Sequence, residues 1–276
     1  MPAAAWDPQQ YLRHSTHRTR PFHDLLARIP ELPGDARPRI ADVGCGAGNV
    51  TALLAQRWPG ARITGLDSSA AMLEAARDHE GPTPGGGSLT FRAADAAHWV
   101  PDGTYDLIVS NAALQWVEGH PDRFPVWVEH LAPGGVLAFQ VPGNFTSPSH
   151  VLLADLCGSP AWRDRLGDGD GGARRHVHVL EPSGYLRRLL ETPGVDVDVD
   201  IWETTYLHLL RGEDPVLEWT KGTALRPVLT ALEDDPQAAG EFLGQYRDLL
   251  RAAYPPGPHG TVFPFRRIFA VARKAG

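Results

Sequence analysis

The sequence predicts an α/β fold, in which a doubly wound parallel sheet carries helices on both faces and a helical cap is inserted near the C-terminal end. Two observations favour this fold class. Between residues 36 and 145, short apolar runs typical of buried strands alternate with segments of helical periodicity. The first of these runs ends in a glycine-rich turn, residues 44–48, that opens a helix. Right-handed crossovers leave few topologies for such a chain.

The elements of the N-terminal half follow from hydrophobic spacing. Phe22, Leu25, Leu26 and Ile29 recur at intervals of three and four residues, which predicts an amphipathic helix over residues 22–29. The same spacing predicts two more helices, and the apolar runs between them predict five strands. The helices are expected at residues 50–58 and 68–77, the strands at 39–43, 61–67, 89–95, 105–110 and 135–141, and a flexible loop at 81–88.

Past Pro142 the pattern changes to mostly helical segments. Apolar residues alternate strictly with aspartates over residues 195–201, which predicts a strand with one solvated face. A last strand is expected at residues 265–273, and helices at 149–166, 183–190, 215–232 and 238–254. We therefore expect three parts, which are N-terminal lid helices over residues 1–34, a ligand-binding core over residues 35–145, and closing strands with helical cap insertions over residues 146–276.

Composition excludes several classes of protein. The chain has 276 residues, 42% hydrophobic and 21% charged, which is typical of a globular protein. Its net charge of −7 disfavours a protein that coats nucleic acid. No run of 18 apolar residues occurs, and the first residues lack the pattern of a secretory signal, so we expect a cytoplasmic protein with no membrane contact. Two cysteines cannot build a disulfide framework or a structural zinc site.

The glycine turn points to a nucleoside ligand. It reads Asp42-Val43-Gly44-Cys45-Gly46-Ala47-Gly48-Asn49, and its glycines let the backbone turn sharply and approach a ligand closely. Ligands of doubly wound sheets bind beyond the carboxyl ends of the strands, where this turn lies. The dinucleotide fingerprint needs a glycine at position 49, where this chain has Asn49, so a nicotinamide oxidoreductase is disfavoured.

An acidic residue follows at the end of the second strand. Asp67 lies 19 residues after Gly48, where a carboxylate can accept hydrogen bonds from both hydroxyls of a ribose. The alternative is that Asp67 caps the helix expected over residues 68–77, although Ser68 and Ser69 also offer caps there.

Catalysis or metal binding is not expected of several other polar residues, which are better explained by packing, a solvated strand face or a loop. Cys45 is a possible nucleophile, but its place between two glycines favours a small packing residue. The aspartates of residues 196–200 resemble the start of a calcium loop, yet Ile201 stands where that loop needs glycine. Metal binding is also not expected in the loop with Asp168 and Asp170, nor at His176 and His178.

The G-x-G-x-G spacing resembles class I S-adenosylmethionine-dependent methyltransferases. Over nearly the whole chain the sequence is similar to one family among them, the trans-aconitate 2-methyltransferases. The glycine turn is shared by the superfamily, whereas residues 202–208 (WETTYLH) and 225–227 (LRP) are specific to the family. The chain departs from the family at Ala47, where proline is usual, and over residues 167–176, where it is rich in glycine and arginine.

The resemblance implies two sets of site residues. In the superfamily an acid at the position of Asp95 reaches the adenine amino group, and arginines at Arg20, Arg226 and Arg267 match family positions suited to a tricarboxylate. S-adenosylmethionine is expected to contact Asp42, Gly44, Gly46, Gly48, Asp67, Ser68, Asp95, Ala96, Asn111 and Arg20. The substrate is expected to contact Arg226, Arg267, Tyr206, His208, Trp219, Gln115 and Trp116.

The implied reaction is transfer of a methyl group to a carboxylate of trans-aconitate or a related small polycarboxylate. Because a carboxylate is ionised at neutral pH, neither a general base nor a metal ion is expected, and no residue is assigned a catalytic role beyond positioning. The product is S-adenosylhomocysteine, and we expect a monomer or weak homo-oligomer. The alternatives are an O- or N-methyltransferase for another acid or a natural product, and a non-catalytic S-adenosylmethionine sensor.

Overall fold

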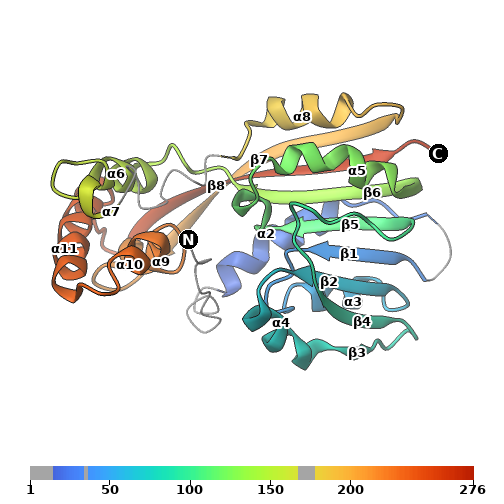
Figure 1. Ribbon diagram of the computed structural model, residues 1–276, viewed down its shortest axis with the longest axis horizontal. Helices are drawn as coiled ribbons and strands as arrows, with labels where there is room; N and C mark the ends of the chain where they lie inside the picture. Colours follow the sequence, from blue (N-terminus) through green and yellow to red (C-terminus); the bar gives the residue numbers. More distant parts are fainter. Residues whose placement is uncertain (1–14, 34–36, 167–177) are drawn as a thin grey trace. The chain divides into compact units, whose positions relative to one another are not determined.

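The computed structural model describes residues 15–33, 37–166 and 178–276 (Figure 1). By their internal contacts these residues form two compact units, which we describe separately. The sheet unit contains the described parts of residues 15–142, together with residues 178–204 and 267–276. The helical unit contains residues 143–166 and 205–266. The loop with Asp168, Asp170 and His176 lies outside the described residues.

The strands form an 8-stranded mixed sheet in the order β3-β4-β2-β1-β5-β6-β8-β7. The five strands from β4 to β6 run parallel, and the edge strand β3 and the closing strand β8 are antiparallel to their neighbours β4 and β6. The order reverses between β1 and β5, and at such a switch point open sheets bind their ligands. The strands are β1 (Arg39–Val43), β2 (Arg62–Asp67), β3 (Gly81–Pro82), β4 (Ser88–Ala93), β5 (Tyr105–Asn111), β6 (Leu131–Pro142), β7 (Val197–Leu210) and β8 (Thr261–Lys274).

Helices of the sheet unit cover an apolar core. Phe124 of α5 stacks on Phe139 of β6 at 4.9 Å and lies 6.1 Å from Tyr185 of α8, and all three rings are fully buried. Burial of such aromatic side chains supplies much of the stability of the unit. Its helices are α2 (Ser15–Arg28), α3 (Thr51–Arg57), α4 (Ala70–Ala76), α5 (Phe124–Glu129) and α8 (Pro182–Leu190), with short 3-10 turns at Arg77–His79, Leu114–Trp116 and His120–Arg123.

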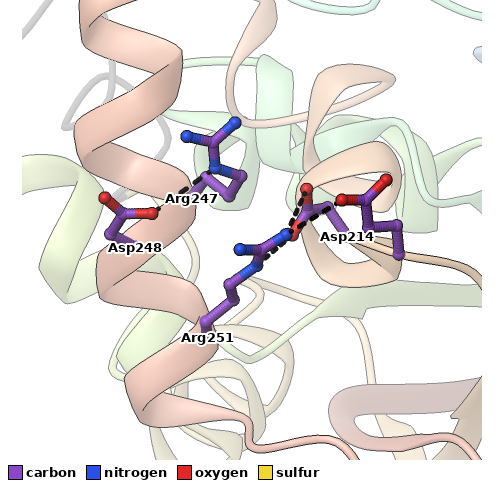
Figure 2. Close-up of polar contacts among 5 residues, drawn as sticks. Asp214, Arg247, Asp248 and Arg251 are labelled. Carbon is purple, nitrogen blue, oxygen red and sulfur yellow. Dashed lines mark hydrogen bonds and ion pairs between the residues drawn. The ribbon is translucent and has the colours of Figure 1, made fainter.

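The helical unit has its own core. Its longest helix, α11, packs on α6 and α9. On the surface Arg251 of α11 lies 2.6 Å from Asp214, at the start of α9, and Arg247 pairs with Asp248 one residue along (Figure 2). The helices are α6 (Pro148–Cys157), α7 (Arg163–Leu166), α9 (Pro215–Lys221), α10 (Arg226–Ala231) and α11 (Pro236–Ala253).

The predicted fold class is confirmed, and the differences in its elements have local causes. The helix expected over residues 149–166 is interrupted between α6 and α7, where Gly158 and Pro160 disfavour a continuous helix. The helix expected over residues 215–232 ends at Lys221, before Gly222, and restarts as α10. The expected loop at 81–88 contains the short strand β3, and helix α5 was not expected.

The strand predicted from the aspartate alternation is correct but too short. β7 continues to Leu210, because buried Tyr206 and His208 go on alternating with exposed Leu207 and Leu209. Helices α9, α10 and α11 fall between β7 and β8 in the sequence, as expected of an insertion. Their role as a cap, and the boundaries at residues 34 and 145, stay predictions.

Candidate active site

The glycine turn between β1 and α3 lies at the strand switch point of the sheet unit. Gly44, Gly46 and Gly48 all have positive φ angles, of 77°, 55° and 78°. A Cβ on Gly44 would lie 2.2 Å from the Cβ of Ala113, so the close approach of the segment after β5 requires a glycine there. A Cβ on Gly46 would meet no atom of the described residues within 4 Å. The turn is therefore closed at Gly44 and open at Gly46.

Asp42 is a buried carboxyl at the base of this turn. Its Oδ2 accepts a hydrogen bond of 2.7 Å from the hydroxyl of Thr51, whereas its buried Oδ1 has no partner among the described residues. Burial raises the pKa of Asp42 to about 7, with a smaller rise from the negative charge of Asp67 and an opposing effect of the Thr51 hydrogen bond. A ligand that donates to Oδ1 would fill an unmet hydrogen bond and favour the ionised form.

Asp67 connects the end of β2 to the glycine turn. Its Oδ2 accepts from the backbone N–H of Gly46, and its Oδ1 from that of Ser69, both at 2.9 Å. The cap of α4 is Ser69, whose hydroxyl accepts from the N–H of Met72. The alternative that Asp67 is the helix cap is therefore wrong for this structure. Each carboxylate oxygen keeps a second lone pair for a ligand.

Asp95 follows β4 and is exposed on its loop, beside half-buried Ala96. Its Oδ1 accepts from the N–H of Ala97 at 2.9 Å, and its Oδ2 lies 2.7 Å from His98 Nδ1. The hydrogen bond to His98, followed by that to Ala97, lowers the pKa of Asp95. Its carboxylate is thus ionised and held by its own loop. Two other expected contacts, Ser68 and Arg20, are exposed in the sheet unit.

Three buried polar side chains form a hydrogen-bonded chain from β5 to β8. Arg267 Nη1 donates to Gln140 Oε1 at 3.0 Å, and Gln140 Nε2 donates to Asn111 Oδ1 at 2.6 Å. The exposed fractions of Arg267, Gln140 and Asn111 are 4%, 0% and 8%. Asn111 and Arg267 were expected site residues, whereas Gln140 was missed. A single polar residue within the apolar run 136–141 (VLAFQV) is the pattern that could have revealed it.

The segment after β5 is held in a strained conformation. Ala112 is the only described non-glycine residue with positive φ, at 54°, and Gln115 Nε2 donates to its carbonyl oxygen at 2.5 Å. Such a conformation costs an alanine on the order of 1 kcal/mol or more and persists only when its surroundings hold it. Gln115 is buried, and Trp116 beside it is 36% exposed. The two expected substrate contacts thus follow directly from the end of β5.

The remaining substrate candidates belong to the helical unit. The ring of His208 stacks on Trp219 with centroids 4.9 Å apart and lies parallel to Tyr206 at 6.3 Å. All three rings are less than 9% exposed, so they contribute to packing as well. Arg226 is half-buried at the first position of α10. The structure brings the three rings together, while Arg267, Gln115 and Trp116 belong to the sheet unit.

The residues assigned to packing or to a solvated face behave as expected. Burial raises the pKa of the Cys45 thiol, which keeps it protonated and a poor nucleophile. The aspartates at 196, 198 and 200 are exposed, and Asp200 pairs with Arg28 at 2.9 Å.

Within the described residues no group of three metal-ligating side chains occurs. None of the helices there has the length and apolar character needed to cross a membrane.

Comparison with known proteins places the chain in a family. Residues 40–135 match a methyltransferase domain model. The chain is 61% identical to the trans-aconitate 2-methyltransferase of Streptomyces coelicolor, over 99% of this chain and 89% of that protein. It is 60% identical to the enzyme of that name from Streptomyces avermitilis, over 99% of both chains.

A solved structure agrees on the fold. Phosphoethanolamine N-methyltransferase 2 of Haemonchus contortus, in complex with S-adenosyl-L-methionine, superposes with a TM-score of 0.51 at 18% identity. The superposition covers 93% of this chain and 53% of that one. From its identity to curated relatives over nearly its whole length, the chain belongs to the family of trans-aconitate 2-methyltransferases.

Proposed function

We propose that this protein transfers the methyl group of S-adenosylmethionine to a carboxylate of trans-aconitate. The products are a monomethyl ester and S-adenosylhomocysteine. The observation that carries the proposal is the 61% identity over 99% of the chain to a protein of that name. The open glycine turn and the two acidic strand ends in the sheet unit support it independently of the comparison.

The sheet unit offers the groups that S-adenosylmethionine needs. The unmet Oδ1 of Asp42 fits the ammonium of the methionine portion, and the remaining lone pairs of Asp67 fit the two ribose hydroxyls. Gly46 leaves room for close approach. We propose that the cofactor site is completed by Gly44, Gly48, Ser68, Asp95, Ala96, Asn111 and Arg20.

The substrate needs cations and a pocket that fixes its orientation. A planar guanidinium pairs with a carboxylate through two parallel hydrogen bonds, so arginine suits a tricarboxylate. We propose Arg267 of the sheet unit and Arg226 of the helical unit for this role. The other proposed substrate contacts are Gln115 and Trp116 in the sheet unit, and Tyr206, His208 and Trp219 in the helical unit.

The reaction requires the protein mainly to position the two reactants. Bound S-adenosylmethionine supplies an activated methyl group on a positively charged sulfur. A substrate carboxylate is already ionised at neutral pH, because carboxyl pKa values lie near about 4. The side chains therefore have to align an oxygen with the methyl group and exclude water, and no proton has to move. Arginines should pair with the spectator carboxylates, since pairing with the attacking one would weaken its nucleophilicity.

We propose that the protein binds no nucleic acid, because its net charge of −7 disfavours contact with phosphate groups. We propose a cytoplasmic monomer or weak homo-oligomer, and size-exclusion chromatography with light scattering measures the oligomeric state.

The decisive experiment is mass spectrometry of products from trans-aconitate, cis-aconitate, citrate and isocitrate with S-adenosylmethionine. We expect a gain of one methyl group on trans-aconitate at the highest kcat/KM. Methylation of none of the four acids contradicts the proposal.

The pH dependence of the reaction is a second test. A single-turnover rate at saturating substrate that is flat from about pH 6 to about pH 9 supports carboxyl methylation, because an essential base would make the rate rise with pH.

A further inference from the structure

The hydrogen-bonded chain from Arg267 to Asn111 has a fixed direction. A guanidinium only donates hydrogen bonds, so the Gln140 atom that faces Arg267 must be the acceptor Oε1. Gln140 then has to present its Nε2 donor to Asn111. Asn111 accepts this hydrogen bond with its Oδ1, so the Nδ2 group of its side chain points away from Gln140. The charge of Arg267 thus decides, through one intervening amide, which end of Asn111 is free to meet a ligand.

The free end of Asn111 is placed at the ligand side of the sheet. Asn111 is the last residue of β5, next to the strand switch between β1 and β5. Within the described parts of the chain Nδ2 donates no hydrogen bond, and it is not among the buried polar atoms that lack a partner, so it keeps some exposed surface. An amide NH₂ group in this position is complementary to a carboxylate oxygen.

We propose that Gln140 is a positioning residue that holds Asn111 with its Nδ2 donor toward a carboxylate of a bound reactant. The inference rests on the proposed function, which supplies two such carboxylates, one on S-adenosylmethionine and one on the acceptor. Gln140 contacts neither of them. It acts through Asn111, and Arg267 sets the direction of the chain.

Two substitutions separate this role from simple packing. Gln140→Glu keeps the shape and the acceptor for Arg267 but removes the Nε2 donor, so Asn111 should rotate, give Nδ2 to Glu, and present Oδ1 to the ligand. Gln140→Met breaks both bonds without reversing Asn111. We expect Gln140→Glu to unfold at the same or a higher temperature than Gln140→Met, yet to have a lower kcat/KM. A packing role predicts that Gln140→Met is worse in both measurements, and that result would overturn the proposal.

A double-mutant cycle removes the effect of the added charge. In the Asn111→Ala background no amide can rotate, so Gln140→Glu should reduce kcat/KM less than about twofold there. In the native background we expect a loss of about 10- to 150-fold, the range for a hydrogen bond to a charged group. An equal loss in both backgrounds contradicts the proposal, because the negative charge alone then explains it.

If Gln140→Glu does not fold, a second variant can place an acceptor oxygen toward the ligand at position 111. Asn111→Asp accepts from the unchanged Gln140 and presents its other oxygen to the ligand. We expect it to lose activity like Gln140→Glu, and kinetic constants equal to those of the native protein would overturn the proposal.

The source of the carboxylate is read from binding as well as turnover. The Kd of S-adenosylmethionine, measured by calorimetry, should rise in Gln140→Glu if the carboxylate belongs to the cofactor. An unchanged Kd with a raised KM for trans-aconitate assigns it to the acceptor, and no change in either contradicts the proposal. A native protein that binds S-adenosylmethionine but methylates no acid fails the proposed function alone, since the binding arm still tests Gln140.

Discussion

Asp42→Asn tests whether burial beneath the glycine turn makes ionisation of the Asp42 carboxyl unfavourable in the folded protein. The substitution keeps the shape of the side chain and an acceptor for Thr51, but it removes the ionisable group. The pKa of Asp42 is raised to about 7 in the folded protein, mainly by burial. In an unfolded chain an aspartate has a pKa of about 3.9.

The sign of the effect follows from proton binding. Between about pH 4 and about pH 7 the folded state binds more protons than the unfolded state, so the wild-type protein loses stability as the pH rises. A difference of about 3 pKa units at 1.36 kcal/mol each gives a penalty of about 4 kcal/mol, absent below about pH 4 and complete above about pH 7. Since the Asn variant lacks this penalty, we expect its advantage in unfolding free energy to grow with pH.

Urea denaturation of the ligand-free proteins at several pH values, followed by tryptophan fluorescence, measures this difference. Asp198→Asn is the control, because it makes the same change of charge on the exposed face of β7. Thr51→Ala should extend the wild-type loss of stability to higher pH, because it removes the hydrogen bond that lowers the pKa of Asp42. A stability difference between Asp42→Asn and wild type that stays constant from about pH 4 to about pH 8 would refute the reasoning.

Three further predictions concern other contacts. Asp67→Ala should weaken S-adenosylmethionine binding by about 1.5–3 kcal/mol in calorimetric titration. An unchanged Kd in the folded variant would show that Asp67 does not contact the cofactor. Tyr185→Phe removes the partner of His120 Nε2, 2.8 Å away in the core, and should lower the unfolding free energy by about 1–3 kcal/mol, whereas a change near zero would show that the contact contributes little. Arg251→Met breaks the exposed pair with Asp214 (Figure 2) and should lower Tm slightly, less so at high salt, whereas a salt-independent loss would indicate that packing is responsible.

The parts of the fold that could be predicted are those set by local patterns. The parallel strands follow from short apolar runs, and Asp42 and Asp67 follow from their places at strand ends beside the glycine turn. Chain direction puts all these strand ends at one edge of the sheet, so sequence position alone brings them together. The family-specific stretches extended the prediction to the reaction.

The chain of amides could not be predicted because it depends on register. Gln140 and Arg267 are 127 residues apart, and they meet because β8 runs antiparallel to β6 with Gln140 opposite Phe269. That register makes Arg267 a diagonal neighbour on the same face. Hydrophobic periodicity fixes which face a residue takes, but not which residue of a distant strand lies opposite. The positive φ of Ala112 was not predicted for another reason, which is that alanine does not mark such a conformation in a sequence.

The close approach of Ala113 to Gly44 limits how position 44 can vary among related sequences. A methyl group on Gly44 would lie 2.2 Å from the Cβ of Ala113, and the positive φ of Gly44 disfavours any side chain there even if Ala113 became glycine. Related sequences should therefore keep glycine at position 44. Libraries that aim to widen the range of accepted acids should leave Gly44 fixed and place their diversity elsewhere.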